Sequence, residues 1–471
     1  MRINKPKTLI DKKNFSLFSK IFLFILFIIF IMGGGFLIAK NALLIILLLI
    51  GTILIFIFLL NFQTGIMLII LTLVIGQLAR ISLPSGGSIV LNDLLIPLVF
   101  LIWLLVKLKR KKLIIYQTHL NLPLVIFIII ALFSLLLNRA HLPLYDLLQS
   151  SAYFWRFLTY SLVFWMVLDT TFLNRKDWNK FYNLSIFIGL LFAFLGFLQL
   201  IFIPSFEFMA KYGWDPHINR LLSTFFDPNF AGGFLVLVLA LILGRLFFSN
   251  NEAEKGIMFY FAIMLVIAII LTFSRSTYLA FLVTILVIGL IKSWRTLLIG
   301  GLAILIIFFT VPRVQERVTG AFDLDVTAKM RLESYKQAYE IIKDYPLTGV
   351  GYNTLRFVRP KYKQIEDTHQ HAAGGFDSSF LTILATTGLF GLLTYLWLYL
   401  IILKNSFLKI FNKNLLWQQK ALSIGILAGL SGLIVHSQFV NSLLYPHIMV
   451  YLWFILGLLF SSLKGDKVNN K

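Results

Sequence analysis

The sequence of 471 residues contains no cysteine and few charged residues. Without cysteine, the chain can form neither a disulfide framework nor a thiolate metal site. Charged residues make up 13% of the chain, which is about half of the share typical of a soluble protein. Hydrophobic residues make up 59%, and the mean hydropathy is +0.89. This composition is that of an integral membrane protein.

Acidic residues are the scarcer charged type, with 20 Asp and Glu against 42 Lys and Arg, so the formal net charge is +22. Such a charge can indicate nucleic-acid binding, but most basic residues here form short clusters between long apolar runs. Under the positive-inside rule, these clusters face the cytoplasm. We therefore expect membrane lipids and no nucleic acid as partners. The clusters are RINKPK, KLKRKK, NRKDWNK and KNSFLKIFNK.

Apolar runs of about 20 residues, the length that spans a bilayer core, recur along the chain. The first run, within residues 1–39, lacks a small-residue cleavage site, so we expect a retained helix rather than a removed signal peptide. We predict an all-α polytopic membrane protein of about 12–14 transmembrane helices in the cell inner (cytoplasmic) membrane, with both termini cytoplasmic. The expected helices are 17–39, 41–60, 64–79, 90–107, 121–138, 151–170, 182–204, 228–248, 257–273, 276–292, 296–311, 377–402, 419–440 and 447–463.

One expected external loop, 312–376, is long enough to fold on its own. Helical periodicity over 327–344 predicts that part of it is a helix. Arg331 heads the apolar stripe that Ala338 and Ile342 continue, so its side chain should point towards the protein body. There an arginine can extend along the stripe, pair with an acidic neighbour or hold phosphate oxygens.

Other arginines are expected on the same side of the membrane. Arg220 lies in NRLLSTFFDPNFAGG directly before an expected helix, and Arg275 lies in TFSRSTY between two hydrophobic runs. Each fits a structural role at the interface when taken alone, but together with Arg331 they put three cations on one side. Arg156 lies within the outer half of an expected helix, where a charge needs a partner carboxylate or an anionic headgroup.

The order of these features resembles the O-antigen ligase and polymerase superfamily of membrane glycosyltransferases. The resemblance implies N-terminal transmembrane helices over 1–204, a catalytic region over 205–463 that includes loop 312–376, and a cytoplasmic tail over 464–471. The matching segments are Arg220 to Asn229, Ser274-Arg275, Arg331 to Gly351, and Asp377 to Gly391.

The resemblance implies an enzyme that transfers a glycan from a polyprenyl-diphosphate carrier, such as undecaprenyl diphosphate, to a glycan or lipid acceptor at the outer face of the membrane. It would act as a ligase or polymerase of O-antigen-like surface polysaccharide in the cell envelope. Arg220, Arg275 and Arg331 would bind the diphosphate leaving group, with Arg156 a further candidate. No cofactor is implied, and arginines can stabilise the leaving group without a metal.

The family places a histidine as proton acceptor directly before the last polar triplet, but Asp377 stands there in this sequence. Either Asp377 accepts the proton, or the loop with Gly374 and Gly375 brings His371 back to the site, with His369 a further candidate. Asp377 can also be a helix cap, and the histidines can be solvated loop residues.

A transporter or flippase of lipid-linked glycans or other anions is the alternative function. Such carriers are expected to show an internal repeat and charges near the middle of the membrane. The sequence shows neither two recognisable halves nor a row of ionisable residues within its apolar runs. Its polar residues concentrate in one external loop, which favours the enzyme.

Overall fold

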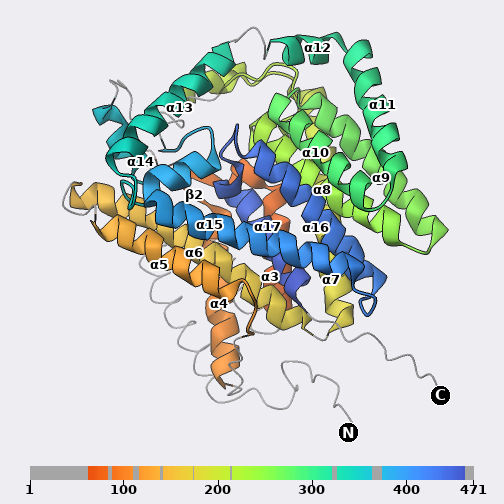
Figure 1. The fold of residues 1–471 in the computed structure, drawn as a ribbon, viewed down its shortest axis with the longest axis horizontal. Coiled ribbons are helices and arrows are strands. Elements are labelled where there is room, and N and C mark those ends of the chain that lie inside the picture. Colours follow the sequence, from red (N-terminus) through yellow and green to blue (C-terminus); the bar gives the residue numbers. More distant parts are fainter. Residues whose placement is uncertain are drawn as a thin grey trace, which may run out of the picture. The chain divides into compact units, whose positions relative to one another are not determined.

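The computed structural model describes residues 62–82, 87–109, 116–137, 142–172, 174–212, 215–320, 326–362 and 374–461. The described chain is helical almost throughout, which confirms the all-α expectation (Figure 1). It divides into two compact units, one of residues 1–69 and 94–114, the other of residues 70–93 and 115–471. The helices expected at 17–39 and 41–60 lie outside the described residues.

Two helices, α3 (Phe62–Leu71) and α4 (Leu91–Lys109), contain residues of both units. Between them lies an antiparallel hairpin of β1 (Arg80–Ser82) and β2 (Ser88–Val90), in which Ile81 pairs with Ile89. The other α-helices of the described chain belong to the second unit. They are α5 (Asn121–Leu137), α6 (Leu144–Thr171), α7 (Arg175–Phe202), α8 (Pro228–Phe248), α9 (Glu252–Leu271), α10 (Arg275–Ile291), α11 (Trp294–Thr310), α12 (Pro312–Thr319), α13 (Val326–Asp344), α14 (Leu355–Val358), α15 (Ser379–Phe411), α16 (Trp417–His436) and α17 (Pro446–Phe460).

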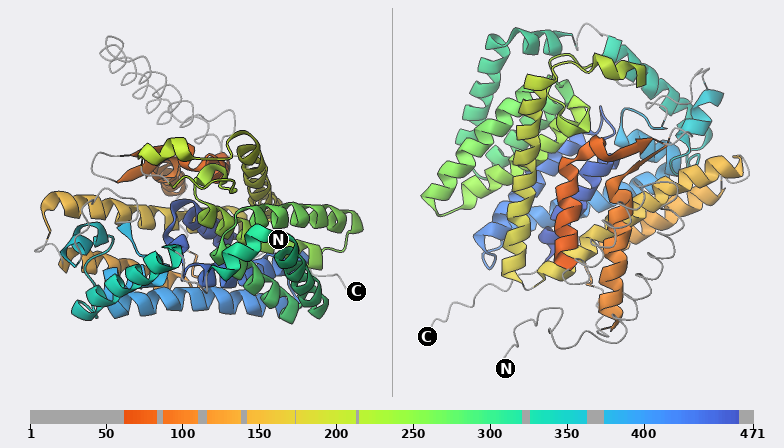
Figure 2. Two further views of the ribbon diagram at one scale, coloured as in Figure 1. Left: turned by 90° about the horizontal axis from the view of Figure 1, so that it is seen from above. Right: turned by 180° about the vertical axis from the view of Figure 1, so that it is seen from behind.

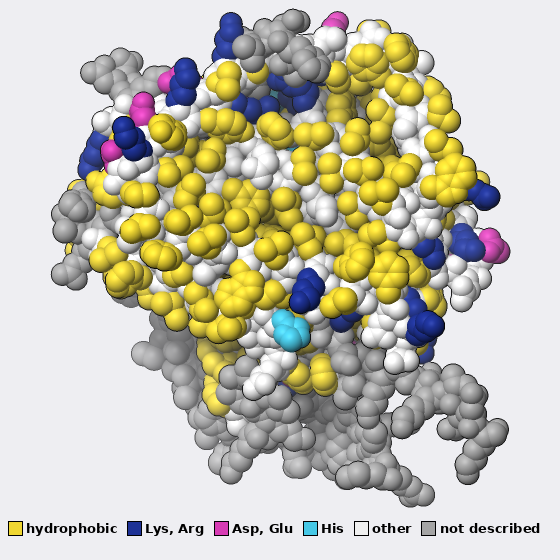
Figure 3. Space-filling view, in the orientation of Figure 1, with side chains coloured by type: hydrophobic (Ala, Val, Ile, Leu, Met, Phe, Trp, Pro, Cys, Tyr) yellow, Lys and Arg dark blue, Asp and Glu magenta, His cyan; other side chains and the backbone are white. Residues whose placement is uncertain are grey.

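Many of these helices suit a bilayer by length and composition. Within the described ranges, six are long and apolar enough to cross a membrane, namely α4, α7, α8, α9, α15 and α16. A seventh span results if α11 and α12, which meet at a bend of 97°, count as one. Four shorter helical stretches are also apolar. Hydrophobic side chains cover most of the described face in Figure 3, as expected of a multi-pass membrane protein.

Several boundaries differ from the sequence-based expectation. The helix expected over 64–79 ends at Leu71 and continues as short 3-10 turns. The basic cluster NRKDWNK, expected in a loop, instead begins α7, because the side chain of Asn174 caps the helix by accepting from the Asp177 amide. The expected span 151–170 is helical within α6, but α6 is not among the six helices above.

The centre of the second unit is the packing of α16 against α8, which are both largely buried. Gly425 and Gly429 lie one turn apart on α16 and face α8. A Cβ added at Gly425 would lie 2.8 Å from the Leu241 Cα, so only small residues allow this close approach. Helices α10 and α15 also pack on α16, while α6 packs on α17. These helices form the frame on which the polar elements described next are placed.

Candidate active site

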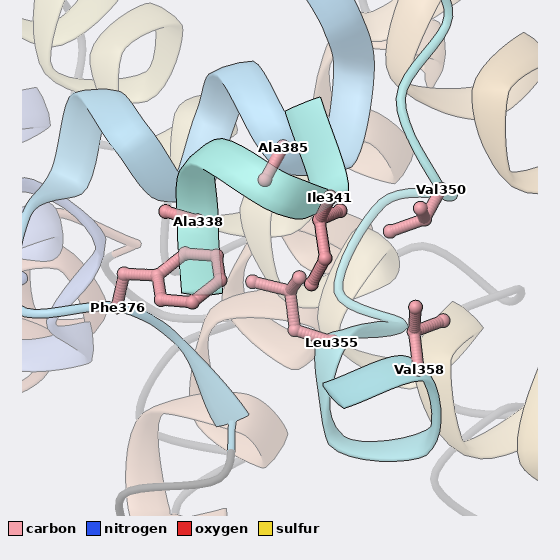
Figure 4. Packing of buried hydrophobic residues seen from close by; sticks show 7 residues of the cluster. All are labelled: Ala338, Ile341, Val350, Leu355, Val358, Phe376 and Ala385. Atoms are coloured by element: carbon pink, nitrogen blue, oxygen red, sulfur yellow. The ribbon is translucent and has the colours of Figure 1, made fainter. Parts of the chain in front are cut away.

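Within the long segment 312–376, residues Val326–Asp344 form α13, which confirms the helix expected over 327–344. Its buried face is formed by Ser334, Gln337, Ala338 and Ile341. Figure 4 shows Ala338 and Ile341 pointing towards residues of two other segments. The complete cluster is Ala338, Ile341, Val350, Leu355, Val358, Phe376 and Ala385. This small apolar core fixes α13 and α14 against the beginning of α15, an arrangement also visible in Figure 2.

The glycine-rich turn after α13 fits into a break in α15. Gly388 interrupts this helix with φ 68° and ψ −170°, a conformation that is essentially restricted to glycine. A Cβ added at Gly388 would lie 2.1 Å from the Leu347 carbonyl oxygen. Gly349 has φ 67°, and a Cβ there would lie 2.3 Å from the Thr386 carbonyl carbon. Each glycine therefore makes room for the backbone of the other segment.

Hydrogen bonds close this junction. The Val350 and Gly351 amides donate to the carbonyls of Ala385 and Thr386 at 2.9 and 3.0 Å. In return, the Leu389 amide donates to the Pro346 carbonyl at 2.9 Å. Because a break in a helix leaves backbone groups without intrahelical partners, the turn supplies the partners that α15 lacks there. The turn of residues 346–351, whose sequence has the pattern P-x-x-G-x-G, thus fixes the position of the following Tyr352 and α14.

A cavity of about 990 Å³ lies beside this junction, within the second unit. Its size is at the upper end of the range for small-molecule sites, which is about 300–1,000 Å³. Its wall combines segments that are distant in the sequence: the β1–β2 hairpin, α6, the loop before α8, α13, residues 352–357, residues 374–386 and the segment before α17. The charged lining residues are Arg80, Arg156, Arg331, Arg356, Asp215, Asp227 and Asp377.

The predicted site residues fall into three groups. Arg331, Asp377 and the further candidate Arg156 all line the cavity. Arg220 and Arg275 are not among the lining residues. His369 and His371 lie outside the described residues.

Arg156 has the partner carboxylate that its depth in a helix requires. Its Nε and Nη2 atoms donate to the two oxygens of Asp93 at 2.7 and 2.5 Å. The Asp93 carboxylate also accepts from the Tyr160 hydroxyl at 2.7 Å and from the Val90 amide at 2.9 Å. Arg156 further donates to the Ser88 carbonyl at 2.5 Å. The ion pair therefore attaches the β1–β2 hairpin to α6 while the guanidinium also reaches the cavity.

Two lining arginines were missed by the sequence analysis. Arg80 begins β1, and Arg356 lies in α14. Burial lowers the pKa of Arg80, and the charges of Arg156 and Arg356 lower it further, so these three cations lie close together. Both missed residues have a sequence signal: Arg80 follows an expected helix at its outer end, and Arg356 follows the Gly349–Gly351 turn by five residues.

Asp377 belongs to a different group of charges. Burial raises the pKa of its carboxyl, the nearby guanidiniums of Arg331 and Arg359 oppose this shift, and the charge of Asp227 adds to it. Asp377 does not cap α15, because the N-cap is Ser378, whose hydroxyl accepts from the Leu381 amide at 3.3 Å. The helix-cap alternative is therefore wrong, and the Asp377 carboxylate is available to the cavity.

Arg220 lies in the loop before α8, and its side chain is buried against the turn between α9 and α10. Its guanidinium donates to the carbonyls of Thr272 and Phe273 at 2.9 and 3.2 Å. Burial, followed by the nearby charge of Arg317, lowers the pKa of Arg220 to about 10. Arg275 is the first residue of α10, directly after the cap residue Ser274. In the described part of the chain, no group of three His, Asp or Glu could hold a metal ion.

Comparison with known proteins places this geometry in a family. Residues 259–396, which run from α9 to the middle of α15, match the O-antigen ligase family. The match identifies an O-antigen ligase region in the chain and supports its place in the O-antigen ligase superfamily. Members of this superfamily transfer glycans in ligase or polymerase reactions, with a lipid-linked glycan and an acceptor as substrates. Arg275, Arg331 and Asp377 lie within the matched residues. Among curated proteins, none matches the chain.

Proposed function

We propose that the protein transfers a glycan from a polyprenyl-diphosphate carrier to a hydroxyl acceptor in the cavity, without a metal. The observation that carries the proposal is the meeting of Arg80, Arg331 and Arg356 in one large cavity of an O-antigen ligase superfamily member. Arginine binds phosphate oxygens through two parallel hydrogen bonds, and it does so without a metal ion. Residues 205–463 then form the catalytic region.

The diphosphate is assigned to the lining arginines rather than to Arg220 and Arg275. Arg80 and Arg356 lie close to Arg156, whose charge is already balanced by Asp93. A diphosphate bound there would neutralise the cations whose mutual repulsion is otherwise costly in a buried site. During transfer, the bond from the anomeric carbon to the diphosphate oxygen breaks, and fixed cations stabilise the negative charge that develops on the leaving group.

The cavity opens, in this proposal, towards the outer face of the cell inner membrane. Both termini are then cytoplasmic, with the tail 464–471 on that side, because the basic clusters of the sequence lie in the connections on the opposite side from loop 312–376. The outer leaflet presents the lipid-linked glycan, and the external loop shapes the cavity through Arg331 and Asp377. The acceptor is a glycan in a polymerase or a lipid in a ligase.

The proposal is tested with Arg80→Ala, Arg331→Ala and Arg356→Ala, each made in the full chain and purified into lipid nanodiscs. Removing one charge-assisted hydrogen-bond donor should weaken binding of undecaprenyl diphosphate by about tenfold or more. Glycan transfer, measured in membrane vesicles of the producing cells, should fall at least as far. Arg295→Ala is the matched control, because Arg295 is exposed on α11 and does not line the cavity.

Two results would contradict the proposal. If all three variants bind undecaprenyl diphosphate as tightly as the parent, the cavity does not hold the donor. If the purified chain moves labelled lipid-linked glycan across vesicle membranes without changing glycan chain length, the protein is a flippase. Arg220→Ala and Arg275→Ala are compared in the same binding and transfer measurements. Since Arg220 holds backbone carbonyls, its variant should lose thermal stability more than affinity.

A further inference from the structure

A histidine outside the predicted site lines the same cavity. His217 lies in the loop between α7 and α8, and its side chain is only 8% exposed. Its Nδ1 atom is 3.5 Å from a carboxylate oxygen of Asp215, which also lines the cavity. A proton on Nδ1 facing this carboxylate leaves the lone pair on Nε2 available. The pair therefore has the composition of a histidine base oriented by an acid.

The backbone at His217 is strained and held from several sides. His217 has φ 43°, and Asn219 has φ 49°, a region that side chains rarely adopt. The Asn219 amide donates to the Pro204 carbonyl at 2.7 Å. From α12, Arg313 donates to the carbonyls of Ile218 and Asn219, each at 2.7 Å. Strain that the surrounding structure maintains in this way is typical of functional sites.

Charged residues of several segments surround His217. Burial lowers the pKa of His217, while the carboxylates of Asp227 and Asp215 oppose the shift and the guanidiniums of Arg220 and Arg317 add to it. A lowered pKa favours the neutral imidazole, which can accept a proton. Burial raises the pKa of the Asp377 carboxyl, and the guanidiniums of Arg331 and Arg359 oppose this shift, so Asp377 has cationic partners of its own in the cavity.

We propose that His217 accepts the proton of the acceptor hydroxyl and that Asp215 positions its ring. This inference rests on the proposed function. In the step, the acceptor oxygen forms a bond to the anomeric carbon as its proton moves to Nε2 of His217. The bond from the anomeric carbon to the diphosphate oxygen breaks, and its electron pair leaves with the lipid diphosphate. The proton is later released to water. Asp377 then acts as the counter-charge of Arg331.

The test compares His217→Gln, Asp215→Asn and the parent as full chains. Removing a general base lowers rates by about 100-fold or more, so His217→Gln should lose transfer to that extent while binding undecaprenyl diphosphate within about threefold of the parent. Asp215 is a positioning residue that is 69% exposed, so its variant should fold normally. Because the Asp215 charge raises the pKa of His217, Asp215→Asn should move the acidic limb of the pH–rate profile to lower pH.

The matched control is His119→Gln, because His119 is exposed at the start of α5 and does not line the cavity. If His217→Gln retains transfer within about threefold of the parent while Arg356→Ala loses it, the role of His217 is refuted and the proposed function stands. If the acidic limb of the pH–rate profile of Asp215→Asn lies at the same pH as that of the parent, the proposed pairing of Asp215 with His217 is likewise refuted. If undecaprenyl diphosphate does not bind the parent, the proposed function itself fails. If His217→Gln misfolds, the pH–rate profile of Asp215→Asn decides whether the proposed role of His217 is correct.

Discussion

Gly388→Ala is the substitution that most directly tests how the loop and the broken helix are joined. Alanine at φ 68° and ψ −170° costs about 1–3 kcal/mol in backbone strain. The new Cβ would also lie 2.1 Å from the Leu347 carbonyl oxygen, so the two segments must separate. Separation breaks the three backbone hydrogen bonds that join residues 346–351 to α15, each worth about 1 kcal/mol.

Together, these effects should reduce the free energy of unfolding by about 4 kcal/mol, which is large for a single substitution. For a chain of this length, the corresponding fall in Tm is roughly 5 °C, which thermal unfolding of the detergent-solubilised protein can measure. Glycan transfer should fall as well, because the displaced turn leads directly to the cavity residues Tyr352, Asn353 and Arg356.

Gly301→Ala is the matched control for this prediction. A Cβ at Gly301, within α11, meets no atom within 4 Å. Alanine there should be neutral or stabilising by up to about 1 kcal/mol, because it favours the helix. A Gly388→Ala protein with the Tm of the parent would show that the break in α15 does not depend on glycine, and the explanation of the P-x-x-G-x-G turn would then be wrong.

Three further predictions concern charged side chains, and Tm is the measurement for each. Asp93→Asn should cost about 3–5 kcal/mol, because it leaves the Arg156 charge without its partner; a loss below about 1 kcal/mol would contradict this. Arg359→Lys should cost about 1–2 kcal/mol, because lysine cannot reproduce the two hydrogen bonds to Gln337, at 3.3 and 2.8 Å. Burial raises the pKa of Asp377 above its usual 3.8, so its stabilising contribution is present at low pH and lost as pH rises through the folded-state pKa. Asp377→Asn should therefore be at least as stable as the parent at pH 7, with the difference vanishing near pH 4; a variant less stable at pH 7 would refute this.

The sequence predicted most helices because long apolar runs leave few alternatives within a bilayer. Helix α8 begins and ends where expected, since Asp227 and Pro228 are strong signals for a helix start. The periodicity of α13 indicated the buried face in part: Ala338 is buried as expected, but the face is centred on Ser334, Gln337 and Ile341, and Arg331 and Ile342 lie at its edge. The early end of α3 was missed because the residues after Leu71 remain apolar, so composition gives no sign of the 3-10 turns.

The site was less predictable because it depends on contacts between distant segments. Arg331 and Asp377 were found from local pattern and motif order, and both line the cavity. Arg80 lies more than 200 residues before them in the sequence, and a hydrogen bond from Arg156 to the Ser88 carbonyl helps to hold its hairpin at the site. Neither periodicity nor composition encodes such a contact, so it is visible only in the three-dimensional structure.

The distribution of charge in the cavity has a consequence for the proposed reaction. Four arginines and three aspartates line it, and Asp93 adds a fourth acid behind Arg156, so the formal charges cancel. This balance lowers the free-energy cost of the charges in the cavity, because an uncompensated buried charge strongly destabilises a membrane protein.

The charges are nevertheless unevenly placed. Arg80 lies close to Arg156 and Arg356, while Asp377 lies close to Arg331 and Arg359 and also to Asp227. A donor whose diphosphate binds the arginine group would have its sugar directed towards the acids. Positive charge developing at the anomeric carbon and negative charge developing on the leaving group would then each be stabilised by the nearer group. On this argument, Asp227→Asn should slow transfer without weakening the binding of undecaprenyl diphosphate. An equal loss in both measurements would instead place Asp227 in donor binding.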